Sequence, residues 1–207
     1  MQHAAPGVEA RSSVYRLLAG LFARELTAEN IAGFKQGSGS QLLDMLENEV
    51  LYSALASNLK MQFSKMADPR QAALDLAESY AWSFHGAGGP HAAPLYASVY
   101  LSESGSTHQE VERELRKIIC EYGLRSDIPH NEPYDHISVI LEFVAWLDDQ
   151  EEHLQKQVFR REIIEKYLLS WLPDFVNQCH HADKPGFYSD LATVTLGLVK
   201  ADFAHYE

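Results

Sequence analysis

The chain has 207 residues, with 29 acidic and 17 basic residues and a formal net charge of −12. Its Lys and Arg form no basic run, which argues against nucleic acid as a partner. With 46% hydrophobic residues it can bury a core, yet no apolar run approaches the roughly 20 residues of a membrane-spanning helix. Its N-terminus lacks the layout of a signal peptide. We therefore expect a folded cytoplasmic protein without stable membrane insertion, whose two distant cysteines, Cys120 and Cys179, form no disulfide framework.

Apolar residues recur at helical spacing along most of the chain. The sequence Asp68-Pro69 predicts a helix start, because a capping Asp precedes a Pro at the first helical position. Thr107 and Glu110 form a capping box, and Gly123 is expected to end that helix. No β-branched run alternates with period two, so the fold class is predicted to be all-α. Helices are expected over about residues 8–24, 42–51, 69–84, 107–123, 133–150, 155–171 and 186–204.

Two segments interrupt this helical pattern. Residues 85–106 are rich in glycine and proline but contain an aromatic stretch, which favours an ordered loop lying on the helices. Residues 124–131 follow Gly123 and contain Pro129, as expected of a hinge. The predicted organisation is an N-terminal helical subdomain over 1–123, a hinge over 124–131 and a C-terminal helical subdomain over 132–207.

Residues 132–136, Glu-Pro-Tyr-Asp-His, combine two carboxylates with a histidine at a predicted helix start. Pro133 suits the first helical position, and the helix dipole stabilises carboxylates there. One interpretation is helix capping, in which Glu132 or Asp135 accepts from unpaired backbone N–H groups and His136 bonds a neighbouring carboxylate or carbonyl. The other is a binding site. The residues alone leave both open.

Other catalytic and metal-binding patterns are weak. None of the ten His follows a Glu by three residues, as a di-iron bundle requires, and there is no phosphate-binding loop with its Lys. His180 and His181 with Asp183 are expected in a surface loop, since adjacent side chains diverge. Residues 103–152 carry nine of the twelve net negative charges. This acidic stretch is either a solvated helix surface or a region that steers a cationic partner.

Several segments resemble one known family. Glu132-Pro133-x-Asp135-His136, continued by Leu141-Glu142, resembles the E-P-x-D-H and L-E signature of the TorD family of redox-enzyme maturation chaperones. Residues 93–100 are similar to the family's Pro-Tyr-x-Ser-x-Tyr segment. Further matches lie at residues 14–26, 76–84, 171–176 and 186–188. The resemblance covers nearly the whole chain.

The resemblance implies a TorD-like helical bundle that acts as a chaperone and not as an enzyme. Such a chaperone serves one molybdoenzyme, here apo trimethylamine N-oxide reductase. It binds the client's twin-arginine signal peptide, assists insertion of molybdopterin guanine dinucleotide into the apoenzyme and delays export until maturation. The chaperone has no cofactor of its own. Family members also show weak guanine-nucleotide binding and domain swapping, so a monomer and a swapped homodimer are both expected.

A twin-arginine signal offers guanidinium groups and then an apolar stretch, so its receptor needs carboxylates beside an apolar groove. We expect Asp135 to receive an arginine and His136 to orient that carboxylate or to contact the peptide backbone, with the groove lying between the two subdomains. The predicted signal-peptide or client site comprises Tyr80, Phe84, Pro94, Tyr96, Tyr100, Glu132, Pro133, Asp135, His136 and Glu142.

Two other functions stay open at this point. A small metal-dependent helical-bundle enzyme would use Asp135, His136 and the pair His180-His181. A generic acidic interaction module would bind through the charge of residues 103–152 alone and would lose affinity in moderate salt.

Overall fold

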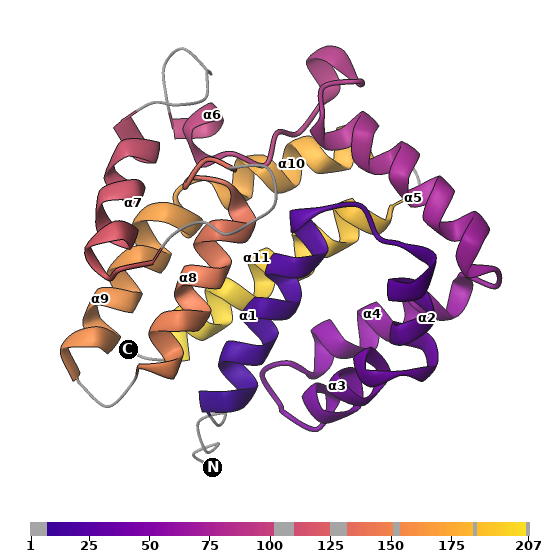
Figure 1. Ribbon diagram of the computed structural model, residues 1–207, viewed down its shortest axis with the longest axis horizontal. Helices are drawn as coiled ribbons and strands as arrows, with labels where there is room; N and C mark the ends of the chain where they lie inside the picture. The colour runs from indigo at the N-terminus through magenta and orange to yellow at the C-terminus, as the bar shows by residue number, and fades with distance from the viewer. Residues whose placement is uncertain (1–7, 102–109, 125–131, 151–153, 184–185, 206–207) are drawn as a thin grey trace. The chain divides into compact units, whose positions relative to one another are not determined.

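The computed structural model describes residues 8–101, 110–124, 132–150, 154–183 and 186–205. Over these ranges the regular secondary structure is helical, with one isolated β-bridge between Tyr96 and His136 and no strand (Figure 1). The prediction of an all-α fold is confirmed. No helix within the described ranges combines the length and apolarity that crossing a membrane requires.

The described residues form two compact units whose segments alternate along the sequence. The first unit comprises residues 24–93 and 176–205, and the second comprises residues 8–23 and 94–175. The hinge expected at 124–131 falls within the sequence of the second unit, and all of it except Leu124 lies outside the described residues. The hinge and domain swapping therefore stay predictions.

The first unit has an aromatic core. The ring of Phe34 stacks on that of Phe63 with centroids 4.5 Å apart, and Phe63 in turn contacts Phe187 at 5.7 Å. These three rings join helices that are far apart in the sequence. The unit contains α2 (Ala28–Gln36), α3 (Ser38–Glu47), α4 (Ser53–Lys65), α5 (Pro69–Phe84), the 3-10 turn η1 (Gly89–His91), the C-terminal part of α10 (Leu172–Ala182) and α11 (Phe187–His205).

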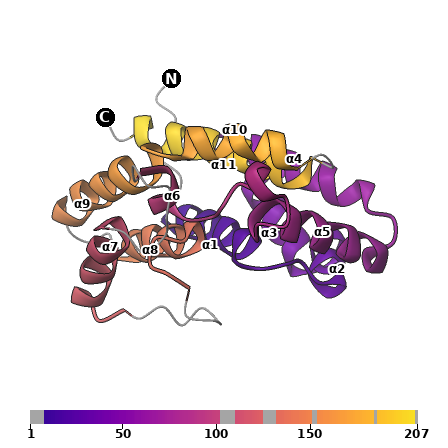
Figure 2. The ribbon, with the colours of Figure 1, turned by 90° about the horizontal axis from the view of Figure 1, so that it is seen from above.

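The second unit is organised around α8, which lies side by side with α1 in both views (Figures 1 and 2). Val14, Leu18 and Leu21 recur at helical spacing on α1, and all three are buried. Most residues of α8 are buried too, which explains why its sequence is apolar on nearly every side. The unit contains α1 (Val8–Ala23), α6 (Ala97–Leu101), α7 (Glu110–Glu121), α8 (Ile137–Asp149), α9 (Leu154–Ile164), the π-helical turn η2 (Glu165–Leu169) and the N-terminal part of α10.

The residues at the helix ends can be compared with the capping residues predicted from the sequence. Asp68 caps α5 by accepting from the Arg70 N–H, as predicted. Gly123 follows α7 with φ of +74°, the left-handed conformation that favours glycine at a helix end. The predicted capping residue Thr107 lies outside the described residues. A capping box that the sequence analysis missed starts α2, where Thr27 pairs with Asn30.

Three predicted helices differ from those observed, one of them the helix expected over 133–150, which begins at Ile137. The helix expected over 42–51 ends at Glu47, and α4 begins after a short turn. The helix expected over 155–171 is interrupted by η2.

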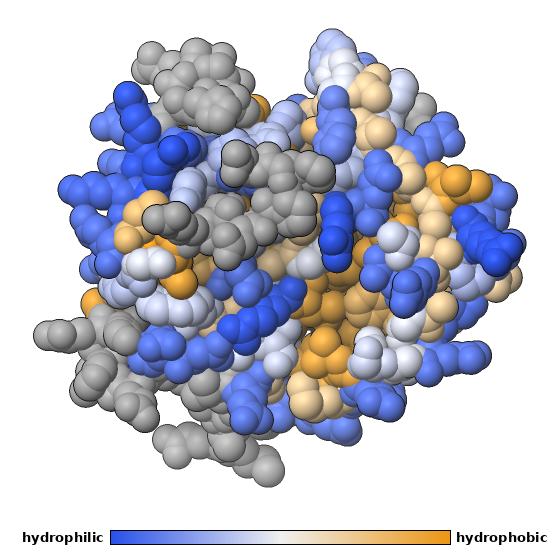
Figure 3. Space-filling view, in the orientation of Figure 1, coloured by the Kyte–Doolittle hydropathy of each residue, from blue (hydrophilic) through white to orange (hydrophobic). Residues whose placement is uncertain are grey.

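Figure 3 shows apolar surface interspersed with hydrophilic surface where α2 to α5 lie. Scattered apolar side chains of this kind are common on protein surfaces and define no site by themselves. The exposed ones include Met45, Val50, Met61, Leu74 and Trp82.

Candidate functional site

The Glu132–His136 motif lies in a turn that leads into α8. This helix begins at Ile137, and the His136 N–H donates to the Pro133 carbonyl at 3.0 Å within the preceding turn. The expectation that Pro133 occupies the first helical position is therefore wrong, because the helix starts four residues later. The motif shapes the approach to the helix instead of forming its first turn.

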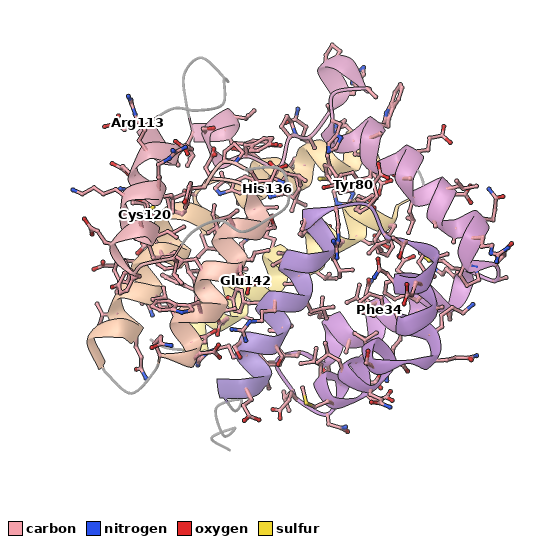
Figure 4. All side chains as sticks on the ribbon, in the orientation of Figure 1. Phe34, Tyr80, Arg113, Cys120, His136 and Glu142 are labelled. Carbon is pink, nitrogen blue, oxygen red and sulfur yellow. The ribbon has the colours of Figure 1, made fainter. Side chains whose placement is uncertain are left out.

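His136 caps α8. Its Nδ1 accepts from the Ser138 N–H at 3.2 Å and lies 2.7 Å from the Ser138 hydroxyl. Because Nδ1 accepts the backbone N–H, the proton of the neutral ring lies on Nε2. His136 is buried, and Figure 4 shows it at the start of the helix, with Glu142 farther along. A residue of the motif thus caps the helix, but it is His136 through the Ser138 N–H, whereas the capping interpretation expected Glu132 or Asp135 to cap and His136 to bond a carboxylate or carbonyl.

Hydrogen bonds connect the segment Leu95–Ser98 to Asp135–Ile137, and we call this set of contacts the clasp. Tyr96 and His136 form an antiparallel bridge, in which the Ala97 N–H donates to the Asp135 carbonyl and the Ile137 N–H donates to the Leu95 carbonyl. The two bonds are 3.0 and 2.8 Å long. The clasp holds the start of α6 against the start of α8.

Asp135 completes the clasp with its side chain. Its Oδ2 accepts from the Ser98 N–H at 3.0 Å, so it satisfies a free amide at the start of α6. Asp135 is 0% exposed, and its Oδ1 has no hydrogen-bond partner among the described residues. A buried carboxylate needs such partners, and this one finds its partner on the neighbouring segment.

The side chain of Tyr96, a residue of the clasp, is half-buried and contacts two motif residues. Its hydroxyl donates to Glu132 Oε2 at 2.9 Å, and its ring lies edge-on to His136 with centroids 5.2 Å apart. Burial, reinforced by the hydrogen bond to Glu132, raises the pKa of Tyr96 well above its ordinary value. The phenol therefore stays protonated and acts as a neutral donor. Glu132 is half-buried as well, so it remains open to solvent in part.

Glu142 sits apart from the clasp, on the exposed surface of α8 (Figure 4). Its Oε1 accepts from Arg16 Nε at 3.4 Å, and Arg16 also pairs with Asp149. This carboxylate therefore already has a cationic partner from α1. The structure does not bring it together with Glu132 and Asp135.

The predicted aromatic residues are divided between the two units. Tyr80 and Phe84 are buried in the first unit, where each contacts the Tyr188 ring, at 5.5 and 5.1 Å. Tyr100 belongs to the second unit, where its ring stacks on Trp171 at 5.2 Å. Pro94 is half-buried at the start of the segment that leads to the clasp. These rings have packing roles whether or not they also bind a partner.

A second feature near the motif shows how this unit holds an arginine. The Arg116 guanidinium donates to Glu112 Oε1 from Nε at 3.0 Å and from Nη2 at 2.7 Å. The same group lies 5.3 Å over the ring of Tyr134, the central residue of the motif. Hydrogen bonding to Glu112 raises the pKa of Arg116, consistent with a tightly held cation. Sequence reasoning missed this arrangement, although the i to i+4 spacing of Glu112 and Arg116 signals the ion pair.

Among the described residues there is no group of three or more His, Cys, Asp or Glu side chains that could hold a metal ion. His180 and His181 lie in the last turn of α10 and not in the surface loop that was expected. His180 approaches the Thr193 hydroxyl at 3.0 Å, and His181 approaches the Asn177 carbonyl at 2.7 Å.

The candidate site of the all-helical second unit thus places the carboxylate of Glu132 beside the aromatic side chain of Tyr96. A family model described as the nitrate reductase delta subunit matches residues 46–177. The Chaperone protein TorD of Vibrio parahaemolyticus is 31% identical over 205 residues, covering 95% of this chain and 94% of that protein. Its namesake from Shewanella loihica is 32% identical, covering 95% of this chain and 93% of that protein. The chain therefore belongs to the TorD family of chaperones, and these relatives carry the name of a chaperone and not of an enzyme.

Proposed function

We propose that this chain is the dedicated chaperone of one molybdoenzyme, trimethylamine N-oxide reductase. In this proposal it binds the twin-arginine signal peptide and the apo form of the client, assists insertion of molybdopterin guanine dinucleotide and delays export. This work takes place in the cytoplasm, before the client is exported. The observation that carries the proposal is the match to relatives named as TorD chaperones along about 95% of the chain.

The geometry of the motif supports a specific division of roles. Glu132 is half-buried and its one hydrogen-bond donor among the described residues is the neutral Tyr96 phenol, so we assign the arginine of the signal peptide to Glu132. Asp135 is fully buried and bonded to a backbone amide, so we assign it to positioning the clasp. This assignment replaces the expectation that Asp135 receives the arginine directly.

The apolar part of the peptide requires a surface beside Glu132. Pro94 and Tyr96 are half-buried at the clasp and offer such a surface within the second unit. Contributions from Tyr80, Phe84 and Tyr100 stay predictions, as do weak guanine-nucleotide binding and a swapped homodimer.

Calorimetric titration with the signal peptide of the client tests the proposal. We expect saturable binding with a negative heat-capacity change, because apolar surface is buried, and a component that persists at moderate salt. Glu132→Gln should weaken binding. Glu162→Gln is the matched control, since it removes the same charge from an exposed position on α9. Absence of binding by the parent protein would overturn signal-peptide recognition.

A further inference from the structure

Two carboxylates of the second unit, those of Glu112 and Glu132, accept from different kinds of donor. Glu112 holds the Arg116 guanidinium, which also lies over the Tyr134 ring. Glu132 accepts instead from the hydroxyl of its own neighbouring tyrosine, Tyr96, at 2.9 Å. Glu132 thus has a neutral phenol as its donor, where Glu112 has a guanidinium that also lies over a tyrosine ring.

The phenol is a replaceable partner. A hydrogen bond from a neutral hydroxyl to a carboxylate is weaker than a charge-assisted bond from a guanidinium. No cation pairs with Glu132 among the residues that the structure describes, and its side chain is partly open to solvent. An arginine arriving from outside can therefore compete for this carboxylate.

The Tyr96 ring has supports that do not depend on its hydroxyl. Its backbone is held by the bridge to His136, and its ring packs edge-on against the imidazole. When the hydroxyl is displaced, the ring therefore stays near Glu132 and offers its face to a planar cation. A guanidinium can use both groups, with two N–H donors to a carboxylate and stacking on an aromatic ring, whereas an ammonium is a point charge.

We propose that Glu132 and Tyr96 form an arginine-selective receptor that the Tyr96 hydroxyl keeps closed until a guanidinium displaces it. The inference rests on the proposed function, because the arginine is that of a bound peptide. It goes further because the Tyr96 hydroxyl competes with the peptide arginine for the Glu132 carboxylate. Removing this hydroxyl therefore improves peptide binding.

The test is calorimetric titration of the full chain with the twin-arginine signal peptide and with the same peptide carrying two lysines. Tyr96→Phe keeps the ring on His136 and should bind the arginine peptide about three- to tenfold more tightly, the value of one hydrogen bond no longer displaced. Glu132→Gln should bind it at least about tenfold more weakly and should lose most of the preference for arginine over lysine. In the Glu132→Gln background, Tyr96→Phe should have no further effect.

The outcomes separate this inference from the proposed function. If the parent protein binds the arginine peptide but Tyr96→Phe binds it equally or more weakly, the competition is disproved and the function stands. Equal affinity of the parent for both peptides would also disprove the arginine-selective receptor. If the parent binds neither peptide, the proposed function and the receptor both fall. Glu132→Gln keeps an oxygen that accepts from Tyr96, so loss of the fold does not confound the comparison.

Discussion

Arg11 donates from Nε to Asp148 Oδ1 at 2.6 Å, although the two residues are 137 positions apart in the chain. Arg160 of α9 also donates to this carboxylate, at 3.3 Å, and its guanidinium lies 5.3 Å over the ring of Tyr15. All three charged groups are buried. One carboxylate therefore ties α1, α8 and α9 together in the interior of the second unit.

Removing the Asp148 carboxylate should destabilise the protein. Asp148→Ala leaves two buried guanidinium groups without their shared partner, and we expect a loss of about 3–5 kcal/mol in the free energy of unfolding. The neighbouring Asp149 provides the control, because its pair with Arg16 is largely exposed and is worth about 1 kcal/mol or less. Urea denaturation of both variants measures the difference. Equal losses would show that burial does not set the strength of this cluster.

Stability at alkaline pH should depend on Tyr188. The side chain is 0% exposed, and burial raises its pKa far above the ordinary value of 10.0. The folded state thus favours the neutral phenol, so this contribution is intact below about pH 10 and is lost as the pH rises further, since the unfolded chain ionises first. Tyr188→Phe should flatten the alkaline fall in stability, measured by denaturation at a series of pH values. The same substitution at Tyr122, which is 39% exposed, is the matched control for removing a phenol hydroxyl.

The two cysteines should differ in reactivity. Cys120 is exposed on α7, whereas Cys179 is buried in α10 and its pKa is raised by burial. The thiolate is the reactive form, so a thiol reagent should modify one cysteine rapidly in the folded protein and the second only on unfolding. Cys120→Ser should abolish the rapid phase and Cys179→Ser should preserve it. A rapid phase that survives Cys120→Ser would contradict the burial of Cys179.

Two glycines should respond in opposite directions to alanine. Gly123 has φ of +74°, and a Cβ there would touch nothing within 4 Å, so Gly123→Ala should cost about 1–2 kcal/mol through the backbone alone. Gly20 lies inside α1, also with open space around a Cβ. Gly20→Ala should stabilise the protein by about 0.5–1 kcal/mol, because alanine favours the helix. Thermal unfolding of both variants tests this contrast. Destabilisation by both would mean that factors other than φ dominate.

Local signals in the sequence were sufficient to predict many helices, but they did not predict which elements pack against one another. The apolar spacing of α1 and the Asp68 cap of α5 depend on residues a few positions apart, and both predictions are confirmed. The start of α8 was misplaced because Pro133 suits a first helical position equally well in a turn. The Thr27 capping box escaped notice because its third residue is Asn instead of Glu or Gln.

The candidate site depends on contacts that have no local signature. The bridge between Tyr96 and His136 joins residues 40 positions apart, and no local sequence pattern in either segment indicates that the two segments pair. The burial of Asp135 likewise follows from the backbone amide that it meets on the neighbouring segment. Periodicity identifies which side chains face a core, but it does not reveal which buried carboxylate meets which donor.

Because α1 packs against α8, the second unit cannot complete its folding until α8 has been synthesised. About 137 residues separate Arg11 from Asp148, so at roughly 5–20 residues per second some 7–27 seconds pass between their synthesis. Until α8 has been synthesised, the buried face of α1 lacks the helix that covers it. A chain with this topology completes its second unit late in translation, and in that interval the nascent chaperone exposes apolar surface of its own.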